Sequence, residues 1–247
     1  MLFKKIIVIT GASKGIGKEI VNKFIKCKTN YLILNSRVEN KYIKRLKKET
    51  NVKFIKGNIS SLKTIKKVFI FLNQNRFKID GMVCNVGGGK NPKNGKEILI
   101  NYKKSFEQNF FSTINIIYKL KKLFNQNSKI VCISSIASKS VVDTPIAYSV
   151  SKSALNSFII NFAKNFKVNK ICITGVLPGH TMHENSVWFK NKKKKPILVK
   201  ELMNKHMQTG EWIKPNDIAE ITYFLINHST NSFNGSLIEL EGGITTK

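Results

Sequence analysis

The stretch "VITGASKGIGKEI" (residues 8–20) joins two runs of different periodicity through a turn that contains Gly11, Gly15 and Gly17. The residues before the turn are apolar and β-branched, which is typical of a strand buried on both faces. The residues after it, from about 16 to 27, repeat their apolar positions with the spacing of a helix. We therefore predict a strand, a tight turn and a helix, which together begin a βαβ unit.

The same alternation runs through the whole chain. Strands are predicted at 3–9, 31–35, 52–56, 80–84, 129–134, 171–176 and 236–240, and helical patterns lie near 16–27, 39–49, 61–74, 98–124, 146–167 and 215–227. This order favours parallel strands, and right-handed crossovers then place helices on both faces of the sheet. We predict an α/β fold of the Rossmann type, with a doubly wound parallel sheet of about seven strands. No Pro/Ser-rich linker interrupts the chain, so residues 1–247 are predicted to form a single domain.

Residues 180–212 interrupt the alternation, because they contain no predicted strand and only mixed helical character. A long insertion of this kind, after the sixth strand, can cover a site, and we predict a lid there. Its lysine run, 192–195, is also typical of a solvated surface.

The formal net charge is +29, and only Arg37, Arg45 and Arg76 among the 43 basic residues are arginine. Such a charge can attract nucleic acid, an acidic carrier protein or anionic lipid. Arginine, which most often reads bases and phosphates, is scarce, whereas lysine accompanies much asparagine and isoleucine. The composition therefore favours codon drift over a nucleic-acid partner, and we expect none.

The four cysteines are scattered and three of them lie in short apolar runs, which is typical of small buried residues. They form no Cys-x-x-Cys pair and have no neighbouring histidines, so we predict neither a metal site nor a structural disulfide. No apolar run approaches the roughly 20 residues that span a bilayer. The first apolar run is too short for a signal peptide and leads directly into glycines, and we expect a cytoplasmic protein.

The glycine turn has the context of a phosphate site. It follows a predicted strand and opens a predicted helix, whose N-terminus offers free N–H groups and the positive end of the helix dipole. Thr10 and Ser13 add hydroxyl groups. This arrangement predicts a dinucleotide site, although the spacing is Gly-x-x-x-Gly-x-Gly and not Gly-x-Gly-x-x-Gly.

The end of the second predicted strand indicates which dinucleotide binds. An acid there accepts the 2′-hydroxyl of NAD, whereas a base accommodates the 2′-phosphate of NADP. The strand ends in Asn35, Ser36 and Arg37, and no acid occurs before Glu39. Together with Lys14 in the turn, Arg37 favours NADP(H) over NAD(H).

Tyr148 and Lys152 lie four residues apart in a predicted helix, and so do Tyr118 and Lys122. Residues at this spacing share a helix face, and a lysine beside a phenol lowers the pKa of the tyrosine. A tyrosine of lowered pKa can act as an acid or base near neutral pH. Spacing alone cannot choose between the two pairs in so lysine-rich a chain.

The surroundings of the two pairs do distinguish them. Ser135 precedes Tyr148 by 13 residues and directly follows a predicted strand, whose carboxyl end is where parallel sheets bind ligands. Ser105 precedes Tyr118 by the same interval but lies in a polar helical segment. Tyr148 also opens a helix with apolar residues at core spacing, and these surroundings favour it over Tyr118.

The chain resembles the short-chain dehydrogenase/reductase family over nearly its whole length. The motifs that carry the resemblance are "TGASKGIG" (10–17), "GNIS" (57–60), "CNVGG" (84–88), Asn109, Ser135, Tyr148, Lys152, "LPGHT" (177–181) and the C-terminal "KPNDIAEITYFL" and "NGSLIELEGG". Asn58, Cys84, Val86 and Glu241 depart from the family pattern. The catalytic set of the family is complete here.

The resemblance implies an oxidoreductase that transfers hydride between a nicotinamide cofactor and a carbonyl or secondary alcohol. Tyr148 would be the general acid/base, Ser135 would bind the carbonyl oxygen, Lys152 would lower the pKa of Tyr148 and hold the nicotinamide ribose, and Asn109 would anchor a water. The residues expected to bind the cofactor are Gly11, Ser13, Lys14, Gly15, Ile16, Gly17, Ser36, Arg37, Asn58, Ile59, Asn85, Val86, Gly87, Tyr148, Lys152, Pro178, Gly179 and Thr181.

The substrate is less determined. Ser135, His180, His183 and Trp188 are the candidate contacts, and Trp188 could stack on a sugar ring. One alternative is a 3-oxoacyl group on an acyl carrier protein, an acidic partner that a basic rim would attract. Another is a sugar or nucleotide-sugar of polysaccharide synthesis. The alternative from another class is a non-catalytic dinucleotide sensor or a basic nucleic-acid-binding protein. By resemblance, a homotetramer or homodimer is expected.

Overall fold

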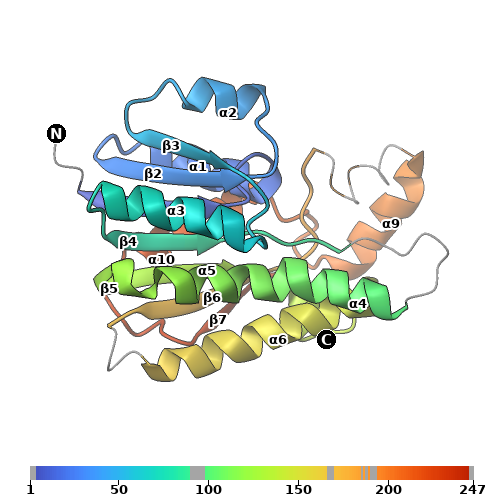
Figure 1. Ribbon diagram of the computed structural model, residues 1–247. Coiled ribbons are helices and arrows are strands. Elements are labelled where there is room, and N and C mark those ends of the chain that lie inside the picture. The colour runs from blue at the N-terminus through green and yellow to red at the C-terminus, as the bar shows by residue number, and fades with distance from the viewer. Residues whose placement is uncertain are drawn as a thin grey trace.

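The computed structural model describes residues 4–89, 98–165, 170–184, 186, 189 and 194–244. Its centre is a sheet of seven parallel strands in the order β3-β2-β1-β4-β5-β6-β7 (Figure 1). The strands are β1 (Lys5–Thr10), β2 (Asn30–Ser36), β3 (Val52–Lys56), β4 (Ile79–Cys84), β5 (Phe124–Ile133), β6 (Cys172–Pro178) and β7 (Leu237–Leu240). The order reverses between β1 and β4, so the crevice outside their carboxyl ends is where a ligand is expected.

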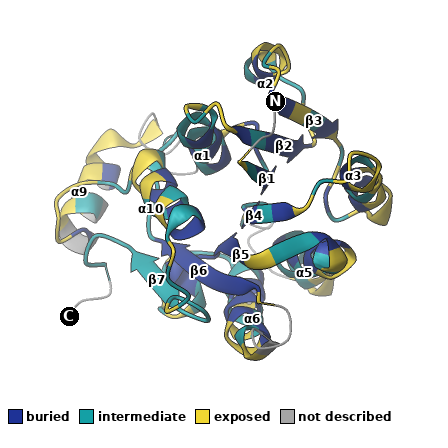
Figure 2. Cartoon of the chain, turned by 90° about the vertical axis from the view of Figure 1, so that its left-hand side faces the viewer, coloured by how far each residue is buried: buried dark blue, intermediate teal, exposed yellow. Residues whose placement is uncertain are grey.

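Helices cover both faces of the sheet, each over its own apolar core. One face packs against α1 (Gly15–Ile25), α2 (Lys41–Leu46) and α10 (Pro215–Asn227). The other packs against α3 (Leu62–Gln74), α5 (Ser112–Leu120) and α6 (Ile146–Phe162). Figure 2 shows the sheet nearly end on, with buried residues between it and both helix layers. Two further helices of the described residues, α4 (Leu99–Phe106) and α9 (Pro196–His206), extend beyond the end of the sheet (Figure 1).

The predicted Rossmann-type sheet is confirmed. Each of the seven predicted apolar runs contains a strand, because central parallel strands bury both faces and must be apolar throughout. The largest difference is in β5, which begins at Phe124 and not at 129. Its first residues are polar and partly exposed, so they lack the pattern of a buried strand.

The helical pattern predicted near 98–124 is present, but it is not a regular α-helix throughout. The helix α4 ends at Phe106, a π-helical turn follows over Glu107–Phe111, and α5 then ends at Leu120 before a single 3-10 turn. Apolar periodicity cannot reveal such a turn, because it inserts only one extra residue into the helix. The π-helical turn carries Asn109, and π-helical turns often occur at functional sites.

The α-helix predicted near 146–167 is shorter in the structure than its sequence pattern indicates. Helix α6 ends at Phe162, and one 3-10 turn over Ala163–Asn165 follows it. Within 180–212 the structure places α9 and a single bridge between Thr181 and Ile213, so the segment is tied back to the chain just before α10.

Three cysteines, Cys84, Cys132 and Cys172, are buried as their apolar runs predict. Over the described residues, no group of three or more His, Cys, Asp or Glu side chains gathers where it could hold a metal. No helix in the described part of the chain is long and apolar enough to cross a membrane.

Candidate active site

The glycine turn after β1 has a backbone that only glycine adopts without strain. Gly11 and Gly15 have φ angles of +69° and +53°. Gly17 has no room for a side chain, because a Cβ there would lie 2.1 Å from the carbonyl oxygen of Gly11. The first turn of α1 follows directly, and no side chain caps its N-terminus. The turn therefore presents free backbone N–H groups and the positive end of the helix dipole, which suit a phosphate.

Asn85, at the end of β4, fixes this turn. Its backbone N–H donates to Thr10 Oγ1 at 3.0 Å, and its side-chain amide donates to the carbonyl oxygens of Thr10 and Gly11 at 3.3 and 3.2 Å. Thr10 in turn donates to the carbonyl of Val83 at 3.3 Å. The carboxyl ends of β1 and β4 are therefore joined where the sheet order reverses.

The end of β2 presents a cation. Arg37 is exposed there, directly after the buried Ser36. The first acid that follows, Glu39, accepts a hydrogen bond from Lys47 at 2.7 Å, and this contact lowers the pKa of the Glu39 carboxyl. The acid is thus engaged by a lysine, and Arg37 remains the charged group at the strand end.

Tyr148 and Ser135 meet beside the end of β5. Ser135 follows the strand and begins a short 3-10 turn, with its hydroxyl oxygen accepting from the N–H of Ala137 at 3.2 Å. Tyr148 lies in the first turn of α6, with its hydroxyl group near that of Ser135. Burial raises the pKa of Tyr148, and the nearby Ser135 hydroxyl opposes that rise. The tyrosine is therefore held in its protonated form.

Lys152 lies one helical turn after Tyr148 and is buried. Its Nζ donates to the carbonyl oxygen of Ile133 at 2.7 Å. Burial lowers the pKa of Lys152 to about 8, while the neighbouring Cys132 and Cys84 act in the opposite direction. In this structure the ammonium group bonds to the strand carbonyl and burial dominates at the phenol, so the expected effect of Lys152 on the pKa of Tyr148 stays a prediction.

Asn109 is the centre of a buried polar network that connects three segments. Its Oδ1 accepts from the N–H of Gly88 at 2.8 Å. Its amide nitrogen donates to Ser105 Oγ at 2.9 Å and Ser151 Oγ at 3.0 Å. Ser151 Oγ donates to the carbonyl of Tyr148 at 2.8 Å. The π-helical turn thus ties the loop after β4 to the first turn of α6.

Ser105 and Ser151 are the members of this network that the sequence interpretation missed. The two hydroxyl oxygens lie 3.0 Å apart. Ser105 was considered only as the serine preceding Tyr118 and was given no role. One signal was available, since Ser105 is four residues before Asn109 on the same helical stretch, at the spacing that places side chains on one face.

The loop after β4 approaches these side chains closely. A Cβ at Gly87 would lie 3.0 Å from both Asn109 Oδ1 and Lys152 Nζ, and a Cβ at Gly89 would lie 3.0 Å from Cγ of Tyr148. The structure therefore brings all four predicted catalytic residues to one place, at the carboxyl ends of β4 and β5.

The competing pair does not form such a site. Tyr118 is 54% exposed, and its ring contacts Phe158 and Phe162 at centroid distances of 6.3 and 6.2 Å. Helix α5 ends at Leu120, so Lys122 lies in the 3-10 turn and not on the same α-helix. Tyr118 is therefore an exposed packing residue and a suitable control for experiments on Tyr148.

Other predicted cofactor residues lie around the same end of the sheet. Asn58 is exposed after β3, whereas the side chain of Ile59 is 2% exposed in the core and could offer only its backbone to a cofactor. Pro178 ends β6, and Gly179 donates its N–H to Leu240 at 2.8 Å. Of the remaining members of the predicted set, Ser13 and Lys14 lie in the loop after β1, Val86 follows β4 and Thr181 follows β6. Ile16 lies in the first turn of α1.

The two histidines predicted to contact substrate lie in different places. The ring of His180 is 6.1 Å from that of Trp212, centroid to centroid. The ring of His183 lies against Gly15, in the glycine turn, which is on the cofactor side of the site. Trp188, the third candidate, lies outside the described residues.

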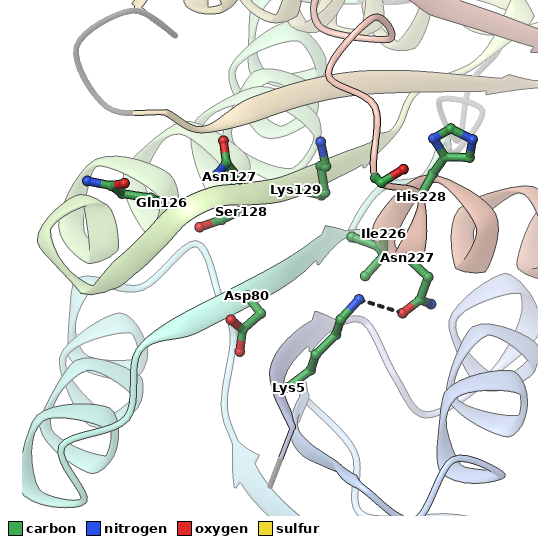
Figure 3. Close-up of a pocket in the computed structure, with 10 residues that line it drawn as sticks. Lys5, Asp80, Gln126, Asn127, Ser128, Lys129, Ile226, Asn227 and His228 are labelled. Carbon is green, nitrogen blue, oxygen red and sulfur yellow. Dashed lines mark hydrogen bonds between the residues drawn. The ribbon is translucent and has the colours of Figure 1, made fainter.

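A separate hollow of about 220 Å³ lies at the opposite, amino-terminal edge of the sheet (Figure 3). Its charged side chains are held by neighbouring protein groups. Lys5 donates to Asn227 at 2.8 Å, Lys129 donates to the carbonyl of Thr230 at 2.8 Å, and Asp80 accepts from the N–H of Ile6 at 2.8 Å. This hollow contains none of the predicted site residues, and its polar groups serve to join β1, β4 and β5 to the end of α10.

The buried Lys152 predicts a pH-dependent stability. Below about pH 8 the folded chain carries a buried ammonium group, and that cost disappears as the pH rises toward the ordinary lysine value of 10.5. We expect the free energy of unfolding of Lys152→Met to be higher than that of the wild type by roughly 2 kcal/mol near pH 7. This difference already allows for the loss of the hydrogen bond to Ile133. Denaturant titrations near pH 7 and pH 10 should show the gap closing. A gap that is equal at both pH values would contradict this assignment.

Comparisons with known proteins agree with the geometry. The family profile described as short chain dehydrogenase matches residues 5–194. An uncharacterized oxidoreductase of Saccharomyces cerevisiae is 30% identical over 179 residues, which are 71% of this chain and 70% of that protein. The structure of 4-hydroxyisoleucine dehydrogenase complexed with NADH has a TM-score of 0.88 at 22% identity and covers 99% of this chain and 100% of its own. The structure of BdcA in complex with NADPH has a TM-score of 0.81 at 20% identity and covers 98% and 94%. At these identities the two structures show a shared fold.

Proposed function

Because the chain belongs to the short-chain dehydrogenase family of NAD(P)-binding oxidoreductases, we propose that it is an NADP(H)-dependent carbonyl reductase or alcohol dehydrogenase that uses Tyr148 as its general acid/base. The observation that carries the proposal is the gathering of Asn109, Ser135, Tyr148 and Lys152 around the loop after β4, at the carboxyl ends of β4 and β5. Asn109 holds the surrounding loop in place.

The residues present fit a dinucleotide. Gly17 leaves no room for even a methyl group in the turn, and the N-terminus of α1 is uncapped, so a diphosphate could approach the backbone closely. Asn85, Gly87 and Lys152 lie where the nicotinamide half is expected in this family. When bound, the reduced cofactor supplies the hydride.

The chain itself manages the proton and the carbonyl oxygen. Ser135 Oγ and the Tyr148 hydroxyl can bind one carbonyl oxygen together, since they lie near each other. The raised pKa of Tyr148 keeps it protonated, which is the form required to donate to the developing alkoxide. The Asn109–Ser151 contact holds the first turn of α6, and so the position of Tyr148.

Arg37 is proposed to give the preference for NADP(H). It is exposed at the end of β2, and the neighbouring acid, Glu39, is paired with Lys47. We expect Arg37→Ala to weaken NADPH binding by about tenfold, as for loss of one charge-assisted hydrogen bond, and to leave NADH binding within about twofold. Fluorescence titration with both cofactors checks this. Tighter binding of NADH than NADPH by the wild type would contradict the preference.

A carrier-bound acyl substrate is favoured by exposed lysines on the segment over residues 180–212. Lys194, Lys195 and Lys200 lie at and within the beginning of α9, and all are exposed. Such a rim would speed encounter with an acidic carrier protein, in a salt-dependent manner. A panel of carrier-bound 3-oxoacyl groups, free carbonyls and nucleotide-sugars, followed by NADPH absorbance, tests the substrate class. Turnover of free sugars alone would instead support the polysaccharide alternative.

Self-association is proposed through the paired helices α4 and α6. Both carry exposed apolar side chains, which are Leu99 and Ile100 on α4 and Val150 and Ile160 on α6. An exposed patch of this kind often marks a protein interface. A homodimer or homotetramer, a cytoplasmic location and a single domain are the arrangement that we propose for the chain.

A further inference from the structure

The segment after β6 reaches back to the glycine turn through His183. A Cβ at Gly15 would lie 2.9 Å from Cε1, 3.0 Å from Nε2 and 3.2 Å from Nδ1 of His183. The imidazole therefore occupies the space that a side chain at Gly15 would fill. Glycine is therefore required at position 15 for two reasons: its φ angle is +53°, and a side chain there would collide with the ring of His183.

The hydrogen bonds of His183 define which ring nitrogen is available. Nδ1 lies 2.8 Å from the carbonyl oxygen of Glu184. A carbonyl oxygen can only accept, so Nδ1 carries the hydrogen of this bond. Ser186 donates its backbone N–H to the carbonyl of His183 at 2.9 Å and holds the turn. Nε2 is then the nitrogen left to face the glycine turn.

The protonation state of Nε2 decides what it can bind. With Nδ1 protonated, neutral His183 offers Nε2 only as an acceptor, and an acceptor repels a phosphate oxygen. Protonation converts Nε2 into a charged donor, which is the form that binds phosphate well. A diphosphate in the glycine turn would bring negative charge beside the ring, and a nearby negative charge favours the charged form of a histidine.

We propose that His183 takes up a proton when the dinucleotide binds and donates from Nε2 to its diphosphate at the glycine turn. The inference rests on the proposed function, because it requires a dinucleotide in the glycine turn. It assigns His183 to the cofactor and not to the substrate. It also makes cofactor affinity depend on pH through one residue.

Binding of NADP⁺ across pH tests the proposal. We compare the dissociation constants of wild type and His183→Gln between about pH 6 and pH 8, because the ratio cancels the titration of the ligand itself. The dissociation constant of His183→Gln divided by that of the wild type is expected to rise from near 1 at pH 8 to about 10 at pH 6. A tenfold change corresponds to the loss of about one charge-assisted hydrogen bond. Calorimetry in buffers of different ionisation enthalpy should show proton uptake by the wild type at pH 7 that exceeds uptake by the variant.

Two further variants keep the test decisive. His183→Lys carries a permanent charge and should bind tightly and with little pH dependence, which a folding defect would not produce. His180→Gln changes the other histidine of the segment, whose ring faces Trp212, and should match the wild type at every pH. A ratio of 1 throughout, or tighter binding by His183→Gln, overturns the role of His183 alone. A wild type that binds no dinucleotide overturns the proposed function as well.

Discussion

Replacing Tyr148 with phenylalanine is expected to lower kcat by about 10³-fold and to leave the dissociation constant of NADPH within about twofold. The change removes the only proton that the hydroxyl can donate, while the ring keeps its place in the first turn of α6. Ser135 keeps its bond to the N–H of Ala137, so the carbonyl-binding hydroxyl stays in place. Steady-state kinetics and a cofactor titration on the same preparation separate the two effects.

The matched control is Tyr118→Phe, which removes the same atom from a tyrosine followed by lysine at the same spacing. Tyr118 lies on the exposed side of α5, where its ring contacts Phe158 and Phe162. Its loss should change kcat by less than about twofold, within the range of neutral surface substitutions. Equal losses in the two variants would mean that the kinetics do not report on the proposed proton donor.

Gly17→Ala is expected to weaken dinucleotide binding by about 100-fold or more, because overpacking of this kind costs a few kcal/mol. The new methyl group would lie 2.1 Å from the carbonyl oxygen of Gly11 and 2.5 Å from Nδ2 of Asn85. The first contact is with backbone, so rotation of a side chain cannot relieve it. The turn must open, and the N–H groups that face the diphosphate move with it. Titration with NADPH, together with thermal unfolding, measures both consequences.

Gly210→Ala serves as the comparison for that experiment. Gly210 has a φ of +68°, but nothing lies within 4 Å of the position of its Cβ. The substitution therefore adds conformational strain, of about 1 kcal/mol, without a steric clash. Its cofactor affinity should equal that of the wild type. If Gly17→Ala binds NADPH as well as Gly210→Ala does, the glycine turn is not the cofactor cradle.

The sheet could be predicted because the apolar pattern of a buried strand depends only on the residues of that strand. The interior strands of a parallel sheet bury both faces, so β1, β2, β4, β5 and β6 leave apolar runs that are visible without any neighbour. The edge strands β3 and β7 are only partly buried. The order of elements then decides the topology through right-handed crossovers. The π-helical turn around Asn109 could not be predicted, because it preserves the apolar pattern on either side of it.

The identity of the catalytic residues could be predicted from the sequence, but the contacts that hold them could not. Ser135 and Tyr148 could be chosen from their places after a strand and at the start of a helix. The network of Ser105 and Ser151 depends on three segments meeting at Asn109, and periodicity does not report such a meeting. The contact of His183 with Gly15 likewise joins residues 168 positions apart in the sequence. The sequence predicts a lid over residues 180–212, but not that His183 contacts the glycine turn.

The most direct test of the central claim is isotopic transfer. The best carbonyl substrate from the panel is incubated with the protein and NADPH that carries deuterium at the transferable position of the nicotinamide, and the product is analysed by mass spectrometry. The account predicts an alcohol that has gained one deuterium at the former carbonyl carbon with wild type, and formation of that product about 10³-fold more slowly with Tyr148→Phe. An alcohol without deuterium, or equal labelled product from the two proteins, would contradict it.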